Sequence, residues 1–154
     1  MPTLGRHVEF DERSRNYSAD RLITKTAAPS SSVHRCYLHL DQGHLGSCVG
    51  NGWTHARATS PHAHSTGLDE SVAVDVYEKA TVLDTVPGSY PPDDTGSSVL
   101  AGAKATVARG WWSAYHWCFT IDTVVDTLLH YGPVVVGTDW LENMFTPHPD
   151  TYVL

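Results

Sequence analysis

The chain has 154 residues, 41% of them hydrophobic, and a formal net charge of −7 at pH 7. This length and apolar content predict one domain with a sizeable core. The acidic balance, with lysines and arginines scattered rather than in a run, argues against nucleic-acid binding, because such a surface repels phosphate. No apolar stretch reaches the roughly 18 residues of a membrane-spanning helix, and the N-terminus lacks a signal-peptide core. We therefore expect a cytoplasmic protein with no membrane or nucleic-acid partner.

The cysteines are Cys36, Cys48 and Cys118, which are too few and too widely spaced for a disulfide framework. Cytoplasmic thiols are usually reduced. Cys36 and Cys118 stand beside apolar and aromatic residues, so we interpret both as small buried hydrophobic side chains. Cys48 differs, because it follows a Gly-Ser turn and opens an amphipathic run.

The first half of the chain moves from loop to helix. Residues 1–32 are predicted to be extended and loop-like, and residues 33–40 form a short strand or an extended segment. A helix then begins at Ser47 or Cys48 and runs to about Thr59. Its internal glycines lower helix propensity by roughly 1 kcal/mol each, and they indicate a neighbour that packs very close.

Two further helices have clear boundaries. Asp69 and Glu70 suit a first turn, and the apolar positions that follow at helical spacing reach Leu83. The next helix covers about residues 97–109, and Gly110 is a favourable C-terminal cap.

The C-terminal part changes character. Residues 111–119 are aromatic and predicted to be extended, and Thr120 can cap a helix whose apolar residues keep helical spacing up to Leu129. Residues 133–137 indicate a buried strand. Because helices come first and strands late, the predicted fold class is α+β. The single domain, 1–154, is expected to contain an extended segment (1–32), a helical half (33–110) and the start of a β half (111–154).

The turn before Cys48 carries the chemistry of an activated thiol. Only the thiolate is a nucleophile, and a helix N-terminus or a nearby histidinium lowers the cysteine pKa from about 8.5. Acyl transfer also needs donors for the oxyanion, which the Gln42 amide and the backbone N–H of Cys48 could supply. The pattern indicates a thiol nucleophile that still needs a histidine in space.

Gln42-Gly43-His44-Leu45-Gly46-Ser47-Cys48 resembles the active-site segment of papain-like cysteine peptidases. Residues 94–98 and 131–137 are similar, in the same order, to the glycine-rich substrate-binding turn and the Gly-Pro-Val strand of that family. Residues 10–17, 40–43 and 139–145 look like compact members of the family from phages and actinobacteria, so the resemblance covers most of the chain. It implies a helical half with Cys48 at a helix N-terminus, a β-barrel-like half, and a cleft between them. It also implies Cys48 as nucleophile and Gln42 as oxyanion donor, with substrate contacts from Gly46, Ser47, Gly96 and Ser97.

The chain departs from that family in several places. Leu45 stands where secreted members have a disulfide cysteine, and Val49 replaces the usual aromatic residue. The family's catalytic His and Asn lie about 130–150 residues beyond the cysteine. The sequence stops at Leu154, so we expect a β half truncated before them. His148 lies in a Thr-Pro-His-Pro loop context and is not expected to act as the base.

Two functions are compatible with these features. One is a cysteine-type peptidase that hydrolyses amides through a Cys48 thioester in a bacterial or phage-infected cell, inactive or incomplete unless a second chain supplies the histidine. The alternative is a catalytically silent papain-like module that binds a peptide or partner protein in the cleft. No cofactor is expected. A zinc site at His55, His62 and His64 is a weaker hypothesis, because they have no acidic or cysteine partner at ligand spacing, and we interpret them as loop residues with no metal.

Overall fold

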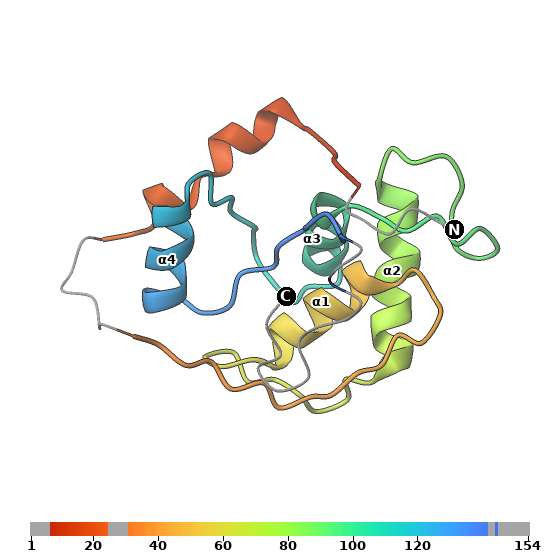
Figure 1. Ribbon diagram of the computed structural model, residues 1–154, viewed down its shortest axis with the longest axis horizontal. Helices are drawn as coiled ribbons and strands as arrows, with labels where there is room; N and C mark the ends of the chain where they lie inside the picture. The colour runs from red at the N-terminus through yellow and green to blue at the C-terminus, as the bar shows by residue number, and fades with distance from the viewer. Residues whose placement is uncertain (1–6, 25–30, 142–143, 145–154) are drawn as a thin grey trace.

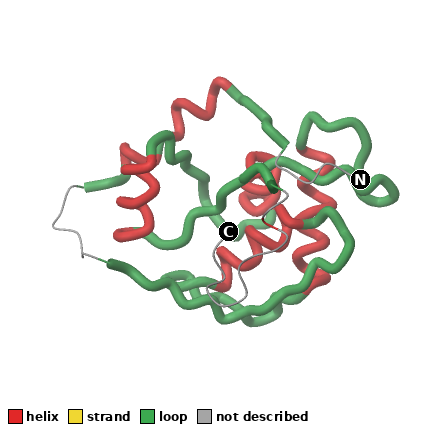
Figure 2. The backbone as a smooth tube through the Cα atoms, in the orientation of Figure 1, coloured by secondary structure: helices red, strands yellow, loops and turns green. Residues whose placement is uncertain are grey.

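The structure is a computed structural model and describes residues 7–24, 31–141 and 144. Three helices gather at one end of the molecule, and a fourth lies apart from them at the other end, beside two short 3₁₀ helices (Figure 1). Long loops join the two groups, as the tube in Figure 2 shows. The elements are η1 (Glu12–Tyr17), η2 (Ala19–Arg21), α1 (Cys48–Ala58), α2 (Glu70–Leu83), α3 (Val99–Ala108) and α4 (Ile121–His130).

The predicted α+β class is wrong for the part of the chain that the structure describes, which is helical and contains no β-strand. Pairing of strand type is limited there to isolated bridges, such as Cys36 with Thr59 and His7 with Ser98. The expected strand at 133–137 and the expected β half from residue 111 onward therefore do not form a sheet, and no β-barrel-like half is present in residues 111–141. An apolar extended run becomes a strand only where a second extended segment supplies a hydrogen-bonding ladder, and residues 133–137 have no such partner among the described residues.

The predicted helices are confirmed to within a few residues. Thr120 caps its helix as the sequence indicates, whereas Asp69, which was expected in the first turn of its helix, is the N-cap. Asp69 accepts from the backbone N–H of Val72 at 3.1 Å at the start of α2, and Thr120 accepts from that of Thr123 at 3.1 Å at the start of α4. Helix α3 starts one residue later than Ser98, which is its cap. Residues 1–32 were expected to be wholly loop-like, but η1 and η2 form within them.

The core lies where α1, α2 and α3 pack together. Its buried side chains are Val49, Val76, Tyr77, Ala80, Ala101 and Ala105. Gly50 makes the close approach possible, since a Cβ there would lie 2.1 Å from the carbonyl oxygen of Ala73 on α2. The expectation of a close neighbour is thus confirmed at Gly50 but not at Gly52, where the nearest atom would be Cγ1 of Val135 at 3.7 Å.

Helix α4 packs on η2 rather than on the core helices. The hydroxyl of Thr123, the buried residue of α4, donates to Oδ1 of Asp20 at 2.6 Å. Ile121 and Val125, two members of its apolar stripe, remain 73% and 46% exposed. The amphipathic period therefore predicts the helix correctly but not the burial of that face.

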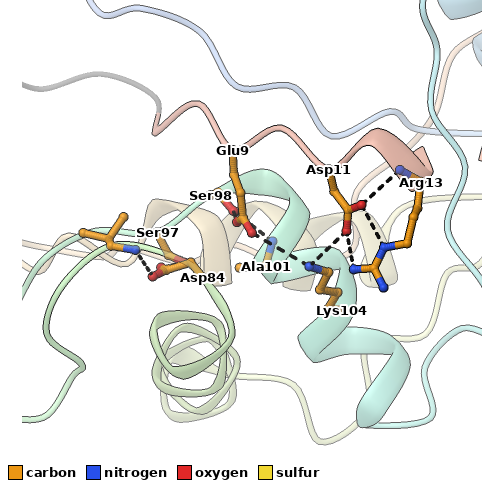
Figure 3. Close-up of polar contacts among 9 residues, drawn as sticks. Glu9, Asp11, Arg13, Asp84, Ser97, Ser98, Ala101 and Lys104 are labelled. Carbon is orange, nitrogen blue, oxygen red and sulfur yellow. Dashed lines mark hydrogen bonds and ion pairs between the residues drawn. The ribbon is translucent and has the colours of Figure 1, made fainter. Parts of the chain in front are cut away.

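A polar network fastens the N-terminal segment to α3 (Figure 3). The Ser98 hydroxyl donates to Glu9 at 2.5 Å and accepts from the backbone N–H of Ala101 at 3.0 Å. Lys104 Nζ lies 3.8 Å from a carboxylate oxygen of Glu9 and 4.0 Å from one of Asp11. Each acidic side chain points from the segment toward the helix, so the Ser98 cap also anchors the segment that carries Glu9.

Candidate functional site at the start of helix α1

The turn before Cys48 is stabilised from within. The backbone N–H of Leu45 donates to the carbonyl of Gln42 at 3.2 Å, and Gly43 adopts a positive φ of 58° that favours glycine. Ser47 occupies the N-cap position, but its buried hydroxyl donates to Oδ1 of Asn51 at 3.0 Å instead of capping the helix. Cys48 is consequently the first residue of α1, as predicted, and it is exposed.

Two segments predicted to form the site are brought together by Asp94. The backbone N–H of Gly46 lies 3.0 Å from each carboxylate oxygen of Asp94. The Tyr77 hydroxyl donates to Oδ1 of Asp94 at 2.6 Å and accepts from the backbone N–H of Gly96 at 3.0 Å. The turn that precedes Cys48 and the turn at Gly96 are thus joined through one carboxylate and one phenol.

The Cys48 thiol is not a stabilised thiolate in this structure. Surrounding protein displaces water from the sulfur and raises the pKa of Cys48 above its usual value, although part of the residue remains exposed. The backbone N–H groups of Val49 and Cys48 act in the opposite direction, and the negative charge of Asp94 adds to the rise. The expected lowering by the helix N-terminus is therefore outweighed, and the thiol is protonated at neutral pH.

The Gln42 amide faces its own turn. Nε2 donates one hydrogen to the carbonyl oxygen of Leu45 at 2.9 Å. The side chain is exposed, and its second N–H has no hydrogen-bond acceptor within the described ranges. That N–H is the group left to meet an oxyanion, so the assigned role of Gln42 stays a prediction.

The other predicted substrate contacts already have protein partners. The Ser97 side chain is buried and its hydroxyl donates to Asp84 at 2.5 Å. The N–H of Gly96 is engaged by Tyr77, and a Cβ at Gly96 would lie 2.9 Å from Nε2 of His7. His7 also donates to the Thr95 carbonyl at 2.8 Å. A substrate that pairs with Gly96 or Ser97 would have to displace these contacts.

Across residues 7–24, 31–141 and 144, no histidine ring hydrogen-bonds to the Cys48 thiol. His34 Nε2 lies 2.6 Å from the Leu128 carbonyl, and the His62 ring packs edge-on against Trp112 at 4.6 Å between centroids. His148 lies outside the described residues. The same part of the chain contains no group of three or more His, Cys, Asp or Glu side chains placed to hold a metal ion.

An apolar cavity of about 530 Å³ lies away from Cys48, between α1, α3, α4 and residues 133–137. Tryptophans 53, 112 and 117 contribute to its lining, with Leu100 and Val134. The indole N–H groups of Trp112 and Trp117 are buried, and neither has a hydrogen-bond partner among the described residues. The concentration of tryptophan in residues 111–117 was the available sequence signal for the cavity.

No protein-family model, curated protein or solved structure matches this chain. Among the described residues, no helix has the length and apolar character needed to cross a membrane.

Proposed function

We propose that this protein is a papain-like cysteine peptidase that hydrolyses peptide amides through a thioester at Cys48. The observation that supports this best is the placement of Cys48, an exposed residue, at the start of α1, on a turn that also carries Gln42. The resemblance to papain-like cysteine peptidases also implies Cys48 as the nucleophile and Gln42 as the oxyanion donor. The fold class is helical in the described residues, so the proposal concerns the chemistry of this turn and not a β-barrel.

In the proposed reaction the Cys48 sulfur attacks the substrate carbonyl carbon, and the carbonyl oxygen becomes an oxyanion. The backbone N–H of Cys48 and the free N–H of Gln42 are the donors that would stabilise it. The C–N bond then breaks, the amine leaves with a proton, and water hydrolyses the thioester to release the acid and restore the thiol. Each step needs a group that takes and returns a proton.

The proposed reaction requires a base that takes the proton of the Cys48 thiol. Because the pKa of Cys48 is raised, the thiol has to lose its proton to a base before or during attack. We assign this role to an imidazole from a second chain that docks beside α1. The proposed substrate is a peptide or protein. A reducing compartment such as the cytoplasm would keep the three free cysteines of this protein as thiols.

A catalytically silent module that binds a peptide is the second candidate. It is favoured by the raised pKa of Cys48 and by the groups that already occupy Gly96 and Ser97. In this candidate the turn at Cys48 is a binding surface, and its thiol has no chemical role.

The rate of Cys48 alkylation by iodoacetamide as a function of pH tests the proposal. Labelling is measured by mass spectrometry on the whole protein. Cys36, which is exposed and not buried as the sequence predicted, is the internal control. If labelling of Cys48 persists well below pH 7, a histidine that has taken the thiol proton stabilises the thiolate by its positive charge, as the peptidase requires. If the alkylation rate of Cys48 rises only at a pH above that at which Cys36 reacts, no base reaches the Cys48 sulfur. The silent binding module is then the better description. A Cys48→Ser variant confirms the assignment of the labelled site.

A further inference from the structure

The contact between Asp94 and Tyr77 joins three parts of the chain that lie far apart in sequence. Gly46 belongs to the turn before α1, Tyr77 to the middle of α2, and Gly96 to the turn before α3. We propose that Asp94 and Tyr77 are positioning residues: together they hold the Cys48 turn at a fixed place relative to the Gly96 turn. The inference rests on the proposed function in so far as Cys48 is the reactive group that is positioned.

Asp94 fits the N-terminal side of this link closely. Its two carboxylate oxygens share the N–H of Gly46, and a Cβ at Gly46 would lie 2.6 Å from Oδ1. Only glycine therefore allows the turn to approach the carboxylate this closely. A carboxylate that accepts backbone and hydroxyl protons forms charge-assisted hydrogen bonds, which are stronger than neutral ones.

Tyr77 supplies the rigid side of the link. The residue is fully buried, and its ring packs on Tyr90 with 5.3 Å between the ring centroids. Its hydroxyl is both donor and acceptor, toward Asp94 at 2.6 Å and from Gly96 at 3.0 Å. Burial and the hydrogen bond to Asp94 raise the pKa of Tyr77, so the hydroxyl keeps its proton and remains a donor at any pH at which the protein would work.

This arrangement makes the two turns depend on each other. A hydrogen bond lost at Tyr77 frees the N–H of Gly96 and also releases one oxygen of Asp94. The carboxylate can then rotate away from Gly46, and the turn that presents Cys48 loosens. If Tyr77 served only as a packing residue, its hydroxyl would have no effect at Gly46. The hydrogen bonds of the two residues meet at Asp94.

Amide hydrogen exchange, followed by NMR on the full chain, tests this coupling. Tyr77→Phe removes only the hydroxyl, and we expect exchange at Gly96 to quicken by about tenfold, the effect of losing one ordinary hydrogen bond. Exchange at Gly46 should quicken as well, by several-fold. Asp94→Ala should quicken both, while Asp94→Asn, which keeps one acceptor oxygen, should restore part of the protection. Asp93→Asn, the same charge change at the neighbouring exposed residue, is the control and should change neither.

The pH profile of Cys48 alkylation is the second measurement. Desolvation is the main cause of the raised pKa of Cys48, and the charge of Asp94 adds to it. Asp94→Asn removes that added contribution, so its alkylation profile should move to lower pH, whereas that of Asp93→Asn should not move. Because Asp94 is exposed, its variants keep the test valid even if Tyr77→Phe folds poorly.

Unchanged exchange at Gly46 in Tyr77→Phe and Asp94→Ala would overturn the proposal. Equally faster amide exchange throughout α2 would also overturn the proposal, because it would show that Tyr77 and Asp94 support the fold as a whole. Neither readout needs catalysis. Coupled exchange with no low-pH alkylation of Cys48 would therefore leave the link standing and remove the peptidase function alone.

Discussion

Replacing Gly50 by alanine tests whether the backbones of α1 and α2 really touch beside the Cys48 turn. The new Cβ would stand 2.1 Å from the carbonyl oxygen of Ala73 and 3.0 Å from the backbone nitrogen of Tyr77. Carbon and oxygen atoms do not approach so closely, so the two helices would have to separate by about 1 Å. Both clashing atoms are backbone, and no flexible side chain can move aside.

The cost follows from two opposing effects. Overpacking of a tight core typically costs about 1–3 kcal/mol, and the upper end applies because a backbone has to shift. Alanine gains about 1 kcal/mol over glycine in helix propensity. We expect a net loss of about 2 kcal/mol in the free energy of unfolding, which corresponds to a fall in Tm of roughly 4–8 °C.

Urea denaturation followed by circular dichroism measures this loss. Gly52→Ala is a matched control, because it lies in the same helix and its Cβ would meet only Cγ1 of Val135, at an ordinary 3.7 Å. The control should be more stable than the parent by up to about 1 kcal/mol. If Gly50→Ala were as stable as Gly52→Ala, α1 and α2 would not be in backbone contact, and the placement of Cys48 beside α2 and Asp94 would lose its support.

Three other outcomes are expected. Ser98→Ala should lower the free energy of unfolding by about 1–2 kcal/mol in the same denaturation assay, because α3 loses its N-cap. Hydrogen bonds from Thr123 and Ser18 lower the pKa of Asp20 in the folded protein below its usual value of 3.8. The Asp20 carboxylate therefore stabilises the fold above pH 3.8, and this stabilisation is lost as the pH falls through the lowered pKa. An NMR titration should show the pKa of Asp20 rising in Thr123→Val, and an unchanged value would refute the hydrogen bond. If the peptidase proposal holds, Gln42→Ala should reduce peptide hydrolysis by about 10²–10³-fold, and undiminished hydrolysis would exclude Gln42 as oxyanion donor.

Local sequence signals predicted the helices well. Asp69 and Thr120 both act as N-caps, and α1 starts at Cys48 as the Gly-Ser turn indicates. These features depend on interactions within a few residues, which the order of amino acids states directly. The expected strand at 133–137 is wrong because a strand needs a partner segment. The apolar pattern of one segment carries no information about which segment lies beside it.

The candidate site divides in the same way. The sequence by itself determined that a thiol opens a helix beside a glutamine amide, because both belong to one continuous turn. Only the tertiary structure decided the state of that thiol. The helix N-terminus alone would lower the pKa of Cys48, yet displaced water and the charge of Asp94 raise it, and Asp94 reaches the turn from a distant part of the chain. Desolvation and Coulomb interactions depend on distance in space, so no spacing along the chain could have given their sign.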